Sequence, residues 1–124
     1  MVGKKLIQTI GNKELLLWLL RFRQRFCVIG FSMFPILKPG EEVLVDTKAY
    51  RHSLPEMGDM VVAEHPHRQD LIIIKWVAFV DEKGNCFLLG ENREQSSDSR
   101  SFGFVSSQKI IGRVTSKFPE QLKS

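Results

Sequence analysis

Residues 71–80, with the sequence LIIIKWVAFV, form the longest apolar run of the chain. β-Branched and aromatic residues dominate it and polar, turn-forming residues border it, a pattern typical of a buried β-strand. Further short strands or apolar runs are predicted at residues 26–31, 41–46, 60–65, 86–90 and 109–114. Many short strands separated by glycine and proline turns predict a mainly β domain.

Polar segments connect these predicted strands as loops and turns, at residues 54–59, 65–70, 81–85 and 91–103. The length of 124 residues suits one compact domain. We expect three parts: a basic amphipathic arm with a short helix at residues 1–26, a β-rich body at 27–117, and a frayed tail at 118–124.

The net charge of +4 is unevenly distributed along the chain. Residues 1–26 carry six basic side chains against the single carboxylate of Glu14, whereas the body is nearly neutral. A nucleic-acid-binding domain usually presents a basic face, so the body is not expected to bind nucleic acid. The basic residues of the arm are Lys4, Lys5, Lys13, Arg21, Arg23 and Arg25.

The apolar run of the arm covers residues 15–20, which is six residues. A membrane-spanning helix needs about 20, and no small-residue cleavage site of a secretory signal peptide follows the run. Two interpretations remain for the arm. An amphipathic segment would touch a membrane surface or a substrate. The commoner arrangement, which we expect here, is a helix that packs its leucines on the domain.

Lys75 interrupts the longest apolar run. Strand alternation places Ile73, Lys75 and Val77 on one apolar face. Burial disfavours the ammonium, lowers the pKa of a lysine and makes the neutral amine available as a general base. On this stretch alone the favoured alternative is a lysine that reaches water at the end of a strand.

Ser32 is the second unusual residue, a hydroxyl inside the apolar, proline-containing segment GFSMFPILKPG of residues 30–40. A serine hydroxyl is a weak nucleophile until a neighbouring base removes its proton, and a lysine is one known base. Ser32 and Lys75 would explain each other if the fold brings them together.

The remaining reactive side chains carry weaker signals. His52, His65 and His67 are expected in exposed polar loops without the spacing of a metal site or of a Ser-His-Asp triad. Cys27 and Cys86 lack ligand or redox spacing, so we interpret them as small buried residues whose pairing stays open. Neither a metal nor another cofactor is expected.

Four segments in order resemble the motifs of type I signal peptidases, the S26 serine proteases: GFSMFPILKPGEEVLVD, GDMVV, IIIKWV and GENREQSSDSRSFGFV. By this resemblance the fold is a small β domain like that of signal peptidases and SOS repressors, and residues 27–117 form its catalytic domain. The resemblance makes Ser32 the nucleophile and Lys75 the general base. It also implies that Ser96 orients the lysine and that Asp98 and Arg100 form a bracing ion pair.

The resemblance has three departures near the proposed chemistry. Trp76 replaces the usual arginine after the lysine, and Glu91 replaces the usual aspartate of the last motif. Gly30 stands where some relatives carry a serine that helps to form the oxyanion hole. Here the hole is expected to use the Ser32 backbone N–H and the region of Gly30, and the loss of one donor can cost about 3 kcal/mol of transition-state stabilisation.

The segment between Lys75 and Gly90 is short, and the membrane anchors of the family are not expected in this chain. These features are most similar to the maturation proteases of nickel-type superoxide dismutase. The resemblance then implies a cytoplasmic serine endopeptidase that removes the leader of the nickel superoxide dismutase proenzyme. A soluble signal peptidase or a mitochondrial inner-membrane peptidase fits the same motifs, with a membrane-associated location as the alternative. A non-catalytic β domain that binds peptides or membranes is the third interpretation.

Overall fold

The computed structural model describes residues 4–5 and 7–118. Seven strands of this part form one sheet, and β1 (Gln8–Thr9) joins it by parallel pairing with the end of β7. The other neighbouring strands are antiparallel, which confirms the predicted mainly β fold. Their order is β2 (Gln24–Cys27), β3 (Glu42–Asp46), β7 (Ile110–Lys117), β4 (Met60–His65), β5 (Arg68–Val80) and β6 (Cys86–Leu89).

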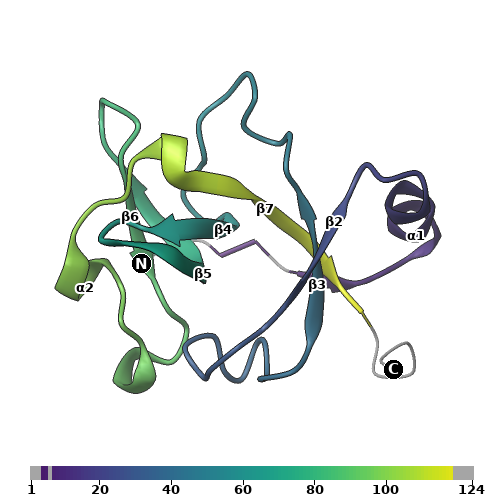
Figure 1. The fold of residues 1–124 in the computed structure, drawn as a ribbon, viewed down its shortest axis with the longest axis horizontal. Coiled ribbons are helices and arrows are strands. Elements are labelled where there is room, and N and C mark those ends of the chain that lie inside the picture. Colours follow the sequence, from purple (N-terminus) through teal and green to yellow (C-terminus); the bar gives the residue numbers. More distant parts are fainter. Residues whose placement is uncertain (1–3, 6, 119–124) are drawn as a thin grey trace.

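The sheet divides the molecule into two halves that β7 connects (Figure 1). β4, β5 and β6 lie in one half, and β2 and β3 lie in the other, with α1 (Asn12–Leu19) at its far end. The segment between β2 and β3 lies at the lower rim of the view, between the two halves. This division places the Ser32 segment against strands that come much later in the chain.

The predicted strands agree closely with the observed ones, but three short helices were missed. β4 has the predicted bounds, whereas β5 begins at Arg68 and reduces the predicted 65–70 connection to a tight turn. The predicted loop at 91–103 contains the 3₁₀ helix η1 (Arg93–Gln95) and α2 (Ser99–Phe102). Asp98 caps α2 by accepting a hydrogen bond from the Arg100 N–H, a local signal for a helix start. A second 3₁₀ helix, η2 (Ser107–Lys109), precedes β7.

Alternating residues of β4 and β5 build two apolar clusters on the two faces of the sheet. Met60, Val62 and Trp76 pack in one cluster with the buried side chains of the β2–β3 segment. Val61, Ile73 and Val77 pack in the other, together with residues of β6. The predicted alternation of residues 73–77 is therefore confirmed, and it places Lys75 on the second face.

The leucines in and just after α1 pack on the domain only in part. Leu15 and Leu17 are half-buried, whereas Leu16, Leu19 and Leu20 are 56%, 64% and 56% exposed. The helix is also held by Glu14, which accepts hydrogen bonds from Arg23 and Thr115, and by the Trp18 ring against Phe118. In the described residues no helix has the length and apolar character needed to cross a membrane.

The arm and the first residue of the tail are more closely joined to the domain than predicted. β2 runs through residues 26 and 27, and β1 pairs with β7, so the arm takes part in the sheet. Phe118, which we placed in the frayed tail, is 2% exposed. The rest of the predicted tail, residues 119–124, lies outside the described residues.

Arg21 ends α1 in a conformation that favours glycine. Its φ is 66°, in the left-handed region. The Arg21 N–H donates to the Trp18 carbonyl and the Phe22 N–H donates to the Leu17 carbonyl, which together form a Schellman motif. A side chain at this position carries a steric cost that glycine avoids.

Replacement of Arg21 by glycine is therefore expected to raise the free energy of unfolding by about 1 kcal/mol. Urea denaturation monitored by circular dichroism measures it. Arg21→Ala is the matched control, because alanine removes the same charged side chain but keeps the Cβ. Equal stability of the glycine and alanine variants would contradict the explanation.

Candidate active site

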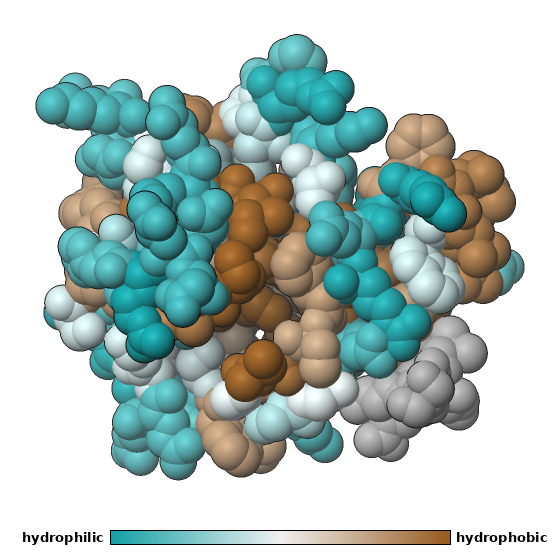
Figure 2. Space-filling model, viewed as in Figure 1, coloured by the Kyte–Doolittle hydropathy of each residue, from teal (hydrophilic) through white to brown (hydrophobic). Residues whose placement is uncertain are grey.

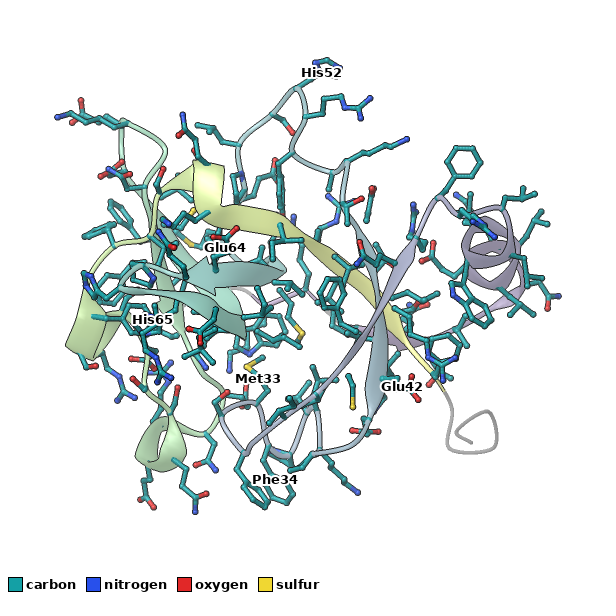
Figure 3. All side chains as sticks on the ribbon, in the orientation of Figure 1. Met33, Phe34, Glu42, His52, Glu64 and His65 are labelled. Atoms are coloured by element: carbon teal, nitrogen blue, oxygen red, sulfur yellow. The ribbon has the colours of Figure 1, made fainter. Side chains whose placement is uncertain are left out.

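The segment that carries Ser32 is fastened to the core. Met33 is 1% exposed and Leu37 is fully buried, and the Leu37 N–H donates to the Met33 carbonyl at 2.9 Å. Phe34 points away from the body while Met33 points inward (Figure 3). Because its neighbour is fixed in the core, Ser32 has a defined position at the edge of the core.

Lys75 meets Ser32 from the middle of β5. It stands opposite Val61 of β4 and is only 4% exposed. The Lys75 Nζ donates a hydrogen bond to the Ser32 Oγ at 2.8 Å. The alternative in which the ammonium reaches water is therefore wrong, and the two unusual residues of the sequence are in contact.

Burial changes the protonation chemistry of Lys75. It lowers the pKa of Lys75 from 10.5 to about 8, and the nearby Asp98 carboxylate acts in the opposite direction. The amine is thus neutral in a substantial fraction of molecules near pH 8. A neutral amine within hydrogen-bond reach of a hydroxyl can take its proton.

Asp98 and Arg100 form the expected ion pair behind this site. Asp98 is fully buried, and its two carboxylate oxygens accept hydrogen bonds from Arg100 Nε at 2.8 Å and from Arg100 Nη2 at 3.1 Å. Burial by itself would raise the pKa of Asp98, but hydrogen bonds from Arg100, the Gly90 N–H and Ser96 keep that pKa below its usual value. The carboxylate therefore stays charged and holds the 90–100 segment together.

Ser96 makes a different contact from the one implied by the resemblance. Its hydroxyl donates to Asp98 Oδ2 at 3.1 Å, while the Lys75 Nζ donates to Ser32. Asp98 also acts electrostatically on the pKa of Lys75. Direct orientation of Lys75 by Ser96 stays a prediction.

Gly90 and Asn92 tie the last motif to the backbone of Ser32. The Asn92 N–H donates to the Ser32 carbonyl at 2.8 Å. A Cβ on Gly90 would lie 2.1 Å from Ser96 Oγ and 2.8 Å from the Ser32 carbonyl oxygen. Only glycine at position 90 allows the backbone to come this close to Ser96 and to the Ser32 carbonyl. The last motif therefore supports the Ser32 segment at its backbone carbonyl.

Gly30 has backbone freedom and open space on the other side of Ser32. Its φ is +81°, and an added Cβ would meet nothing within 4 Å. No other residue of the described part of the chain accepts a hydrogen bond from the Ser32 backbone N–H. The N–H that we expected in an oxyanion hole is thus available to a ligand.

An apolar groove of about 370 Å³ leads to the Ser32–Lys75 pair. It is lined by residues 26–29 on the β2 side and by residues 71–75 of β5. β2 is an edge strand, and β5 pairs with β6 only from Trp76 onward, so two strand edges face the groove. Figure 2 shows hydrophobic side chains in a hollow between the two halves.

His65 is closer to the site than expected. It lies at the end of β4, half-buried against the Phe102 ring at a centroid distance of 4.6 Å. It lines a second depression beside Ser32 and Lys75, together with Arg68. The predicted strand at 60–65 already ended at His65, but its partial burial was missed because it depends on the tertiary contact with Phe102. His52 and His67 are exposed as predicted.

The cysteines and carboxylates show no metal chemistry in the part of the chain that the structure describes. Its His, Cys, Asp and Glu side chains do not gather in groups of three or more that would hold a metal. Cys27 is exposed, which corrects the prediction that it is buried. Cys86 is buried, which raises its pKa to about 11, and neither cysteine is in a disulfide.

A hydroxyl beside a buried amine, at the end of an apolar groove, is typical of hydrolases that attack through serine. A family model described as signal peptidase, peptidase S26, matches residues 6–81 and 79–118. The chain therefore belongs to the S26 signal peptidase family and is a signal-peptidase-like protease of the serine type.

Two proteins of known name are similar in sequence to much of this chain. Signal peptidase IB of Staphylococcus aureus (strain Mu50) is 24% identical over 174 residues, which cover 86% of this chain and 91% of the relative. The mitochondrial ATP-independent inner membrane protease subunit 1b of Arabidopsis thaliana is 32% identical over 107 residues, 68% of this chain and 63% of that protein.

Replacement of Lys75 by methionine is expected to stabilise the fold by about 2 kcal/mol at pH 6. The unfolded chain binds the lysine proton more tightly than the folded one, so burial is costly below the folded pKa of about 8. This cost shrinks as the pH rises toward 10.5. Urea denaturation at pH 6 and pH 10 measures both effects.

Lys13→Met is the control for this measurement, because Lys13 is exposed. Its stability should change little at either pH. A Lys75→Met protein that is less stable than the wild type at pH 6, or equally stabilised at both pH values, would contradict the assigned burial cost.

Proposed function

We propose that this protein is a serine endopeptidase that uses Ser32 as nucleophile and Lys75 as general base to remove an N-terminal leader from a precursor protein. The observation that carries the proposal is the 2.8 Å contact between Lys75 Nζ and Ser32 Oγ at a buried position. Burial supplies the neutral amine, and the contact supplies the geometry for proton transfer.

The proposed reaction proceeds through an acyl-enzyme. Neutral Lys75 takes the hydroxyl proton as Ser32 Oγ attacks the scissile carbonyl, and the Ser32 backbone N–H stabilises the oxyanion in the region of Gly30. The lysine then gives its proton to the leaving amine. Water, activated by Lys75, hydrolyses the ester and frees Ser32.

Ser96, Asp98 and Arg100 act in this proposal as positioning residues. Asp98 receives hydrogen bonds from Ser96, Arg100 and the Gly90 N–H, and Gly90 packs against the Ser32 carbonyl. This network supports the backbone that presents the nucleophile, which is the function of groups surrounding a catalytic pair.

The groove accommodates the leader as an extended strand. The edges of β2 and β5 face it, and an extended peptide can pair with an exposed strand edge through main-chain hydrogen bonds. Its apolar lining favours small or apolar leader side chains near the cleaved bond. The scissile carbonyl would then lie at the end of the groove, beside Ser32.

We propose the nickel superoxide dismutase proenzyme as the substrate. The five-residue connection between β5 and β6, residues 81–85, supports this choice, because the classical signal peptidases that the sequence resembles often carry an extra β domain there. The similarity to signal peptidase IB favours a second candidate, a precursor with a secretory signal peptide. The first substrate belongs to a cytoplasmic protease and the second to a membrane-associated one.

Incubation of the purified protein with each candidate tests the function and the substrate together. The two probes are a nickel superoxide dismutase proenzyme and a precursor peptide with an A-x-A signal-peptide site. We expect one cut at the leader boundary, read by mass spectrometry. Ser32→Ala and Lys75→Ala should each reduce kcat by about 10³-fold or more, because the two side chains work as one unit.

The pH dependence is part of this test. The ratio kcat/KM should rise with pH and reach half its maximum near the Lys75 pKa of about 8, because only the neutral amine is a base. His65→Ala tests the alternative of a histidine base, since His65 lines the depression beside Ser32 and Lys75. His52→Ala is its control at an exposed position. Full activity of Ser32→Ala or of Lys75→Ala would overturn the proposed chemistry.

We also propose that the exposed leucines of α1 contact an anionic membrane surface. Leu16, Leu19 and Leu20 project to solvent, and Figure 2 shows hydrophobic side chains at the α1 end. Lys13 and Arg21 are exposed at the two ends of the helix, and such a combination of apolar and basic side chains favours anionic lipid.

Co-sedimentation with phosphatidylglycerol vesicles tests the membrane contact. The triple variant Leu16→Ser, Leu19→Ser, Leu20→Ser should bind at least about 10-fold more weakly than the wild type. Leu54→Ser is the control, because Leu54 is an exposed leucine elsewhere. Absence of wild-type sedimentation, or equal sedimentation of the triple variant, would refute the contact.

A further inference from the structure

Two of the three positions at which the motifs depart from the family contact each other. Trp76 follows Lys75 on β5, and Glu91 follows Gly90 after β6. The Trp76 Nε1–H donates to Glu91 Oε1 at 2.9 Å. Trp76 is 4% exposed, so its indole N–H needs a partner, and Glu91 provides one.

Lys4 of the N-terminal segment completes this contact. Its Nζ donates to the same Glu91 Oε1 at 2.7 Å and lies 5.7 Å from the centroid of the Trp76 ring. The hydrogen bond from Lys4 is the main cause that lowers the pKa of Glu91. One lysine thus contacts both the carboxylate and the indole, and Lys4, Glu91 and Trp76 are together called the Lys4 cluster.

The backbone that presents Lys4 is anchored independently of this cluster. The Lys5 N–H donates to the Gly58 carbonyl at 3.0 Å, and Lys5 Nζ donates to the buried Asp59 at 2.7 Å. Asp59 also accepts a hydrogen bond from Tyr50 at 2.6 Å. Lys4 is therefore held at a defined place beside Trp76.

The Lys4 cluster is connected to both elements that carry Ser32 and Lys75. Glu91 is flanked by Gly90, which packs on the Ser32 carbonyl, and by Asn92, whose N–H donates to that carbonyl. Trp76 is the direct neighbour of Lys75 on the same strand. Lys4 and Trp76 also line one depression together with Pro35 and Ile36 of the Ser32 segment.

We infer that Lys4, Glu91 and Trp76 are positioning residues that set the separation of Ser32 from Lys75, so that the N-terminal segment forms part of the catalytic apparatus. This inference rests on the proposed Ser32–Lys75 chemistry. Loss of the Lys4–Glu91 hydrogen bond loosens the Gly90–Asn92 segment, and the Ser32 backbone moves with it. A displacement of about 1 Å at a reacting pair can cost about 10²-fold in rate.

Kinetics of Lys4→Met and Glu91→Gln test the inference with the probe that the wild type cleaves. Each should lower kcat at least about 5-fold and leave KM within about 2-fold, because the groove is unchanged and the reacting pair is displaced. The double variant should lose no more than Glu91→Gln alone, since both changes remove one interaction. Lys4→Arg should restore most of kcat because it keeps the cation.

Two controls match these charge changes. Lys83→Met removes an exposed cation from the turn between β5 and β6, and Glu94→Gln removes an exposed carboxylate from the same loop as Glu91. Both should behave as the wild type. If kcat of Lys4→Met and of Glu91→Gln stays within about 2-fold of these controls, the inference fails.

A measurement without substrate separates this failure from failure of the proposed function. Competitive acetylation with acetic anhydride across a pH range reports the pKa of Lys75 in the wild type and in Lys4→Met. A loosened site admits water, so that pKa should move upward by about 0.5 or more in Lys4→Met. The pKa of Lys75 should stay in place in Lys83→Met, and an unchanged value in Lys4→Met overturns the inference.

Ser32→Ala and Lys75→Ala in the same kinetic series complete the design. If both lose activity while Lys4→Met keeps it, only the inference about the Lys4 cluster falls. If either Ser32→Ala or Lys75→Ala keeps full activity, the proposed Ser32–Lys75 chemistry is refuted, and the inference that rests on it is refuted as well. Thermal unfolding of each variant shows whether it is folded. The Lys4 variants are expected to fold, because the Lys4 side chain is 38% exposed.

Discussion

Burial of the Lys75 amine is the constraint on which the rest of the site depends. The amine lies inside an apolar face of β5, and Ser32 Oγ receives its hydrogen bond at 2.8 Å. A charged ammonium in such surroundings is unfavourable, which lowers its pKa to about 8. Stability and function therefore oppose each other at this residue, and the fold tolerates the cost because neighbouring groups hold the amine against a hydroxyl.

The surrounding structure brings three distant parts of the chain to this amine. The Ser32 segment is anchored by Met33 and Leu37, and its carbonyl is held by the Asn92 N–H. Asp98 gathers the last motif through its buried carboxylate, and Gly90 permits the close approach to Ser32. The groove between the edges of β2 and β5 then leads to the pair. Each contact joins segments that are local in space but remote in sequence.

Much of the fold was predictable because its signals are local. The β-branched run at 71–80 and the turn residues around it correctly predicted β5 and the face of Lys75, since side chains alternate along any strand. The two short helices of the 91–103 segment were missed because they depend on a capping carboxylate and a few residues each. The exposed leucines of α1 were also missed, because whether an apolar helix face is covered depends on what packs against it.

The sequence by itself determined the residue types and their order. It also determined the alternation along β5 that directs the Lys75 side chain toward an apolar face. It also marked Ser32, Asp98 and Arg100 through motifs that resemble one family. Only the tertiary structure decided that Ser32 and Lys75 touch, that Ser96 donates to Asp98, and that Trp76 and Glu91 meet with Lys4. The physical reason is that burial and distance depend on strand pairing between remote segments, and no local pattern encodes which hydroxyl or carboxylate will lie within hydrogen-bond reach.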